Sequence, residues 1–274
     1  MNPLSKLCLH TITNKPWPLP ELLDKYAATG VGGVSVWQNA VEPYGISQAA
    51  SFLAAHSIEV VSYVRGGFFP GPNHAARQQA INDNKVMIEE AAALGAPILV
   101  LVCGAEPTAG LVASRNQIQD GIEAILPHCQ AHDVKLAIEP LHPMYADTRS
   151  AINTLEQAND MAEIFDCEHV GVAVDVYHLW WDPHLEKEIK RCGSMGNLLA
   201  YHICDWKYPP EDMLNDRGLM GEGCIPIAQI SEWVSATGFT GMHEVEIFSN
   251  RYWSMNQDEF LSKIVHSYKE LYHI

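Results

Sequence analysis

Four acidic or imidazole side chains in the C-terminal half of the chain stand at or near the ends of separate apolar runs. A charged group that closes a buried strand is costly unless it is paired or bound to an ion. Three carboxylates and one imidazole, without a thiolate, suit a hard divalent ion. We therefore predict a site for one divalent metal ion, Mn²⁺, Mg²⁺ or Co²⁺ with Zn²⁺ as the alternative, formed by Glu139, Asp175, His202 and Glu246.

Short β-rich runs alternate with amphipathic helical segments along the whole chain. The predicted strands span residues 7–12, 33–38, 59–64, 98–104, 135–140, 171–176, 199–204 and 243–248. The helical segments between them include residues 19–30, 46–57, 76–95, 116–133, 150–166, 227–238 and 258–272. Eight strand–helix units within about 250 residues predict an α/β fold, a (β/α)8 TIM barrel, as a single domain over residues 1–274. A doubly wound open sheet is the alternative.

The positions of the four candidate ligands favour the closed barrel. They follow predicted strands five to eight, and only closure brings the carboxyl ends of these strands around one axis. Residues two apart on a strand share a face, so placing the ligands inward also places Ala137, Ala173 and Ala200 inward. On strand eight the same face carries both Glu244 and Glu246. Glu246 lies nearer the mouth, and we prefer it as the ligand.

Composition excludes several classes of partner. The chain has 274 residues, of which 47% are apolar, and a formal charge of -16, which argues against a nucleic-acid partner. The N-terminus lacks the pattern of a signal peptide, so we expect a cytoplasmic protein. The longest apolar stretch, around residues 96–105, is about half the length of a membrane span, so no membrane role is expected. The seven cysteines are scattered and indicate reduced thiols.

Several short motifs carry a resemblance to a known family. The segments IEPLHP, VDVYH, YHICDW, GEGCIP and GFTGMHEVE resemble the xylose-isomerase-like TIM-barrel superfamily in their order and spacing. This superfamily includes ketose 3-epimerases, inosose dehydratases and endonuclease IV. The resemblance implies the same four metal ligands as above. It further implies that His178 contacts substrate hydroxyls and that Arg217, in the loop after strand seven, does likewise.

Each proposed substrate contact has a structural alternative. His178 could pack beside Trp180 and Trp181, and Arg217 could form a surface ion pair with Asp216. Trp37 follows strand two and could stack on a sugar face, or serve core or dimer packing. His142 could reach the rim of the pocket or cap the loop. Aromatic residues at the barrel mouth suggest a homo-oligomer. The candidate substrate-binding residues are therefore His178, Arg217, Trp37 and His142.

The residue types fit proton transfer next to a carbonyl. A divalent ion can stabilise the enediolate that forms when such a proton is removed. The resemblance implies that Glu139 and Glu246 act as base and acid in a sugar isomerase or epimerase acting on a small ketose or polyol-derived ketone. An inosose-type or dehydroshikimate-type dehydratase is the alternative.

Two other functions are less favoured. A nuclease like endonuclease IV needs extra histidines on strands two and three, which are missing here. A non-catalytic sugar-binding barrel has no need for two facing acids. A phosphorylated substrate is also not favoured, because the sequence shows no basic cluster beyond Arg65 and Arg217. We therefore expect the substrate to be an uncharged sugar or polyol ketone.

Overall fold

All eight predicted strands form, and parallel hydrogen bonding closes them into a barrel in a computed structural model that describes residues 2–274. Around the barrel the strands follow one another in the order β1, β10, β7, β6, β5, β4, β3 and β2. Their bounds are β1 Leu7–His10, β2 Gly33–Trp37, β3 Glu59–Gly67, β4 Ile98–Val102, β5 Lys135–Glu139, β6 Val170–Asp175, β7 Leu198–Ile203 and β10 His243–Val245. The closed barrel confirms the predicted fold and rules out the open sheet.

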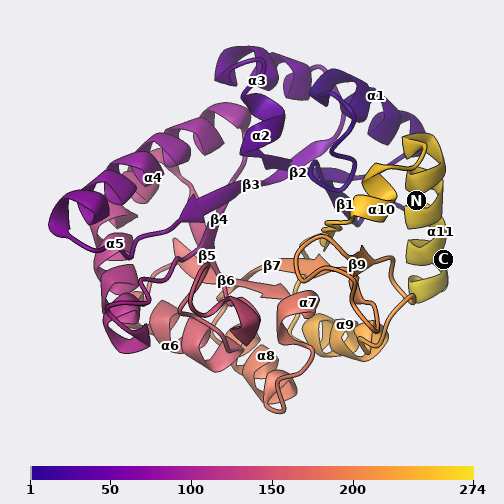
Figure 1. Ribbon diagram of the computed structural model, residues 1–274. Helices are drawn as coiled ribbons and strands as arrows, with labels where there is room; N and C mark the ends of the chain where they lie inside the picture. The colour runs from indigo at the N-terminus through magenta and orange to yellow at the C-terminus, as the bar shows by residue number, and fades with distance from the viewer. Residues whose placement is uncertain (1) are drawn as a thin grey trace.

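Helices surround the barrel as a ring (Figure 1). The outer helices are α1 Leu19–Thr29, α3 Ile46–Ala54, α4 His74–Leu94, α5 Leu111–His132, α6 Leu155–Phe165, α8 Leu185–Ser194, α9 Ile227–Ala236 and α11 Gln257–Tyr272. Local signals explain several ends: Asn73 accepts a hydrogen bond from the backbone N–H of Ala76 at the start of α4, and Gly95 ends it with φ 76°. Helix α8 lies outside the predicted segments.

The barrel divides the apolar residues into two cores, as the alternation predicts. Inside the barrel the core consists of small and β-branched side chains, Val64, Val100, Ala137, Ala173 and Ala200. The larger core lies between strands and helices and includes the outward residues of the same strands, Leu136, Ile138, Val172, Val174, Tyr201 and Ile203. Small alanines on β5, β6 and β7 leave the axis open near its carboxyl end, where the polar side chains stand.

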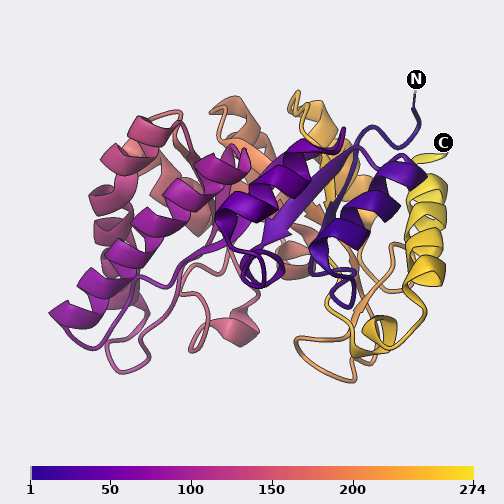
Figure 2. The ribbon, with the colours of Figure 1, turned by 90° about the horizontal axis from the view of Figure 1, so that it is seen from above.

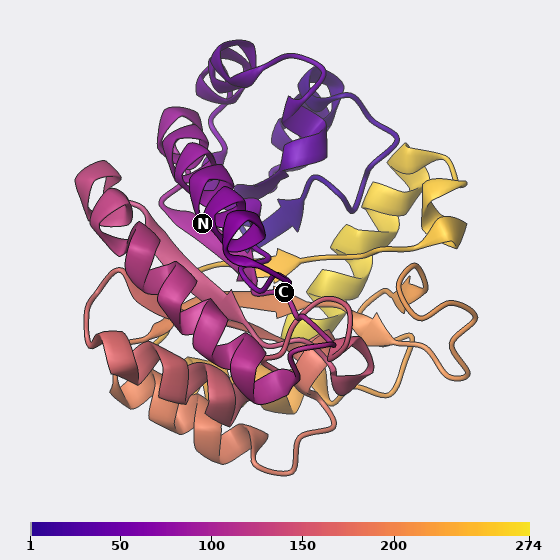
Figure 3. The same cartoon turned by 60° about the vertical axis from the view of Figure 1, so that its left-hand side comes forward.

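The loops after the strands build the wall above the barrel. They carry four short helices, α2 Gln38–Val41, η1 Pro143–Tyr145, α7 Val176–Leu179 and α10 Asn250–Trp253, and an antiparallel pair, β8 Asp205–Trp206 with β9 Arg217–Gly218. Figure 2 shows these loops projecting together at its lower edge. The long helices α4 and α5 pack side by side outside β3 to β5 (Figure 3). Within residues 2–274, no helix combines the length and apolar character needed to cross a membrane.

Candidate active site at the carboxyl ends of the strands

The four predicted ligands converge. Glu139 ends β5, Asp175 ends β6, His202 lies in β7, and Glu246 directly follows β10. All four are buried, and one ligand atom from each lies within 4.8 Å of the others. An ion bonded to two such atoms holds them no more than about 4.3 Å apart, so only a small inward shift is needed for a common centre. The arrangement is suited to a divalent cation.

Asp175 provides a direct test of whether a cation fits. Its Oδ1 accepts a hydrogen bond from the backbone N–H of Tyr177 at 2.6 Å, which starts α7. Its Oδ2 is buried and has no hydrogen-bond donor within residues 2–274. Burial raises the pKa of Asp175 to about 7, against the opposing charge of Arg217. Arg217 Nη1 lies 3.6 Å from this oxygen, but a buried carboxylate oxygen without a hydrogen bond, close to three other ligand groups, is also one that a bound cation would satisfy.

The surroundings of His202 favour its protonated form. Its Nδ1 lies 2.8 Å from Glu139 Oε1 and 4.0 Å from Asp175 Oδ2. Burial opposes protonation of the ring, but the carboxylates of Glu244 and Glu139 raise its pKa to about 10. A metal ion requires the neutral imidazole, so binding would release this proton. The carboxylates around His202 therefore favour a positive charge, supplied either by a proton or by a cation.

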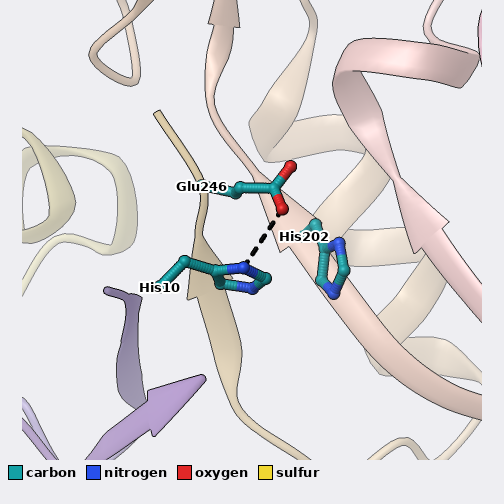
Figure 4. A group of neighbouring side chains, drawn as sticks. All are labelled: His10, His202 and Glu246. Atoms are coloured by element: carbon teal, nitrogen blue, oxygen red, sulfur yellow. Dashed lines mark ion pairs between the residues drawn. The ribbon is translucent and has the colours of Figure 1, made fainter. Parts of the chain in front are cut away.

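Glu246 is held in its ionised form. Arg217 Nη1 donates to its Oε2 at 2.5 Å, and His10 Nδ1 lies 3.1 Å from its Oε1. Figure 4 shows this second contact, with His202 beside the His10 ring. Burial by itself would raise the pKa of Glu246, but the charge of Arg217 and then that of His10 outweigh it and hold the pKa well below its ordinary value.

His10 is a part of the site that the sequence reasoning missed. It ends β1, and its ring centroid lies 4.7 Å from that of His202. With His202 and Glu246 it forms a second, overlapping group that could hold a metal ion. The signal for it was the one used for the other ligands, a polar residue that closes an apolar strand, but it was not applied to strand one.

Glu244 lies one layer below the candidate ligands, inside the barrel. Its carboxylate accepts hydrogen bonds from Ser35 Oγ at 2.5 Å and Ser62 Oγ at 3.2 Å. His10 Nε2 lies 3.3 Å from the same carboxylate. Burial opposes its ionisation, yet His202 and His10 keep its pKa below the ordinary value. Glu244 is therefore positioned to hold the two histidines rather than to meet a substrate.

Arg217 and His178 meet beside the four ligands. Arg217 lies in β9, is buried, and stacks over Tyr177 and Phe248 with 4.4 and 4.9 Å between guanidinium and ring centres. Its Nη2 lies 3.3 Å from His178 Nε2. Burial and then the charge of Arg217 lower the pKa of His178 well below its ordinary value, so His178 is neutral. The alternative ion pair of Arg217 with Asp216 is wrong, because Asp216 pairs with Lys207.

The two remaining predicted contacts differ in their placement. Trp37 ends β2 on the cavity wall, and its Nε1 lies 3.0 Å from His10 Nδ1. His142 lies outside the cavity lining. Its Nδ1 accepts from the backbone N–H of Met144 at 3.2 Å, and its own N–H donates to His178 Nδ1 at 3.3 Å. His142 therefore caps η1 and supports His178 from behind.

A small cavity lies above the barrel mouth, and Glu139 and Glu246 of the four predicted ligands line it. Its wall contains Glu139 and Glu246 together with three predicted substrate contacts, His178, Arg217 and Trp37. It also contains residues that the sequence did not indicate. The lining residues are Trp37, Arg65, Val102, Glu139, Leu141, Tyr145, Arg149, His178, Leu214, Arg217, Glu246 and Phe248. This mixture of apolar walls and convergent polar groups is typical of a small-molecule site.

Asp205 organises the loop that carries Arg217. Its buried carboxylate accepts hydrogen bonds from the backbone N–H groups of Gly221 and Gly223 at 2.9 Å and of Ile225 at 3.0 Å. These bonds fix the segment GEGCIP, while the β8–β9 pairing sets Trp206 opposite Arg217. The loop is thereby a fixed support for the guanidinium.

The chain is similar in sequence to a known protein family and to curated enzymes. The family model described as "Xylose isomerase-like TIM barrel" matches residues 23–264. A curated inosose isomerase from Bacillus velezensis is 22% identical over 230 residues, which cover 80% of this chain and 78% of the relative.

Two solved structures are close in fold. A crystal structure of a Sinorhizobium meliloti 1021 protein has a TM-score of 0.95 and 42% identity, and the match covers 98% of both chains. The structure of the IolI protein, solved with a bound zinc atom, has a TM-score of 0.85 and 20% identity over 97% of both chains.

Proposed function

The chain belongs to the xylose isomerase-like TIM-barrel family, and on that premise we propose that it is a divalent-metal-dependent sugar isomerase or epimerase. The substrate is a small ketose or polyol-derived ketone. The observation that carries the proposal is that two buried carboxylates, Glu139 and Glu246, reach one cavity from β5 and from the end of β10. The curated relative is named an isomerase, which supports the same class.

The residues that would hold the metal are Glu139, Asp175, His202 and Glu246. When bound, a divalent cation supplies positive charge that stabilises the two oxygens of an enediolate. The bare Oδ2 of Asp175 and the raised pKa of His202 support this ligand set, because both mark a point where positive charge is favoured.

Proton transfer rests on the placement of the two glutamates. In the barrel, β6 and β7 separate β5 from β10, so Glu139 and Glu246 approach a substrate from different sides. Glu246 is ionised, because Arg217 and His10 lower its pKa, and it can accept a proton from the carbon next to a carbonyl. Glu139 can return a proton from its own side. Such a pair would move a hydrogen between neighbouring carbons or invert one centre.

Arg217 and His178 would hold the substrate. The Arg217 guanidinium donates hydrogen bonds only, and the neutral His178 ring, whose Nδ1 accepts from the backbone N–H of His142, can donate from its Nε2. Both line the cavity beside Glu246. The low pKa of His178 also supports an isomerase over a dehydratase, since an imidazole that stays neutral is a poor acid for a departing hydroxide.

The test is isotope exchange. The metal-loaded protein is incubated in D₂O with a panel of ketoses and inososes, and deuterium at each carbon is followed by NMR. The proposal predicts deuterium at one carbon next to the carbonyl. Conversion of a substrate to an alkene product would instead support the dehydratase, and a complete lack of exchange and turnover with cation bound would reject both.

A further inference from the structure

Two arginines line the cavity without an anionic partner. Arg65 lies in β3, and its guanidinium is 5.9 Å from the Trp37 ring and 4.9 Å from the Phe68 ring. Its Nη1 is buried and has no hydrogen-bond partner within residues 2–274. Arg149 lies in the loop after η1 and is 5.7 Å from the Tyr145 ring. In the described chain neither guanidinium forms an ion pair, unlike Arg217, which is paired with Glu246.

The two arginines lie on a different side of the mouth from the proton-transfer groups. Arg65 lies two residues before the end of β3, and the loop of Arg149 is joined to the segment after β4 by the backbone N–H of Gly104, which donates to the Arg149 carbonyl at 2.8 Å. His178 follows β6, and Glu246 follows β10. The cavity therefore has one region above β2 to β4 with two free guanidinium groups, and another above β5 to β10 with the metal ligands.

The charges make the first region a site for an anion. Four buried carboxylates surround the centre, Glu139, Asp175, Glu244 and Glu246. A divalent cation and Arg217 offset three of these four charges. One negative charge then remains, and the two positive charges of Arg65 and Arg149 exceed it by one. Any positive charge on His10 would add to this excess. Burial, and then the positive charge of Arg149, lower the pKa of Arg65 against the opposing charges of Glu246 and Glu139, which places the two guanidinium groups close enough to repel each other.

We propose that Arg65 and Arg149 bind an anionic group of the substrate, a carboxylate or a phosphate, while its ketone lies at the metal ligands. The planar guanidinium fork matches both oxyanions and can bind either through paired hydrogen bonds. The rings of Trp37 and Phe68 lie within cation–π range of the Arg65 guanidinium. The inference rests on the proposed function and narrows its substrate class to a keto-sugar acid or a sugar phosphate, in place of the uncharged ketone expected from the sequence.

The first test measures binding and does not depend on turnover. Inorganic phosphate and malonate are titrated by calorimetry into the metal-loaded wild type and into Arg65→Gln and Arg149→Gln, at constant ionic strength. A hydrogen bond to a charged group is worth about 1.5–3 kcal/mol, so each variant should bind at least one of the two anions about tenfold or more weakly. Arg251→Gln, an exposed arginine outside the lining, should bind like the wild type. No binding of either anion to wild type, or equal binding to all four proteins, would overturn the inference.

The second test asks which substrates are used. Deuterium exchange is compared for a neutral ketose, the matching keto-uronate and the matching ketose phosphate. The wild type should prefer one anionic form over the neutral one, and the preferred form identifies carboxylate or phosphate as the group. The ratio of kcat/KM for anionic over neutral substrate should fall about tenfold or more in Arg65→Gln and Arg149→Gln. Equal use of neutral and anionic forms, or an unchanged ratio in both variants, overturns the inference and leaves the proposed function in place.

Failure of the two proposals can be told apart. If no substrate exchanges while phosphate or malonate binds through Arg65 and Arg149, the proposed function fails and the anion site stands. If Arg65→Gln does not fold, because its side chain packs between two rings, Arg149→Gln in its loop carries the same comparison alone.

Discussion

Arg217 donates a hydrogen bond to the carboxylate of Glu246, 29 positions further along the chain. This contact joins the loop after β7 to the end of β10, and with His10 it keeps Glu246 ionised inside the protein. The residue proposed to take the substrate proton is thus set in its charged form before substrate arrives. Several measurable consequences depend on this pair and its surroundings.

Replacing Arg217 by Met should raise the pKa of Glu246. The folded pKa is now depressed, so activity that needs the ionised form persists down to low pH in the wild type. Without the guanidinium, the acid limb of the pH profile of kcat/KM for exchange should move to higher pH, and the rate should fall by about 10²-fold or less at neutral pH. Arg251→Met serves as the control. An acid limb that stays in place would mean that Arg217 does not set this pKa.

The metal-free protein should lose stability as pH rises above neutrality. The pKa of His202 is about 10 in the fold and 6.5 as an ordinary value, so the stabilisation from its charge is complete below about 6.5 and is lost as pH approaches 10. Urea unfolding of the chelated protein should therefore show falling stability from about pH 7 to about pH 9. The His202→Gln variant should show a flatter dependence. An equal slope in both proteins would contradict this assignment.

Metal binding should have the opposite dependence on pH. A cation needs His202 neutral and Asp175 ionised, and the pKa of Asp175 is about 7. The gain in Tm on adding MnCl₂ should be larger at about pH 8.5 than at about pH 6. Asp175→Asn should reduce the gain at both values. A gain that is the same at both pH values would argue that the cation binds elsewhere.

Removing the Asp205 carboxylate should loosen the loop that carries Arg217. In Asp205→Ala the backbone N–H groups of Gly221, Gly223 and Ile225 lose their acceptor, at a cost of about 1–3 kcal/mol for each group left unpaired. Hydrogen exchange followed by mass spectrometry should show faster exchange in the segment 219–225. Exchange in α4 should not change. Unaltered protection of the loop would show that other contacts hold it.

Much of the fold could be predicted because it repeats. Alternating strand and helix patterns mark each unit, and the small inward alanines of β5, β6 and β7 were visible as every second residue. The metal ligands could be predicted for a related reason, since a polar residue at the end of an apolar strand must lie at the barrel mouth. His10 satisfies this rule as well as Glu139 does, because it ends β1.

The rest depends on loops, whose paths are not periodic. Nothing in the sequence indicates that Arg149 returns to the cavity, because its position is set by hydrogen bonding to Gly104 from another strand. The resemblance implies that Arg217 lies at the substrate, but it does not indicate that its partner is Glu246 rather than the neighbouring Asp216. The expectation that His142 meets the substrate gains no support from the structure, because His142 does not line the cavity and its Nδ1 and backbone N–H form local hydrogen bonds.

Glu246 is proposed to move a proton next to a substrate carbonyl. The most direct measurement is deuterium incorporation from D₂O by metal-loaded wild type, Glu246→Gln and Glu244→Gln, with retained fold checked by circular dichroism. Wild type should label one carbon next to the carbonyl, Glu246→Gln should label it about 10²–10⁴-fold more slowly, and Glu244→Gln should be slowed far less. Normal exchange by Glu246→Gln, with loss of exchange in Glu244→Gln, would contradict the account.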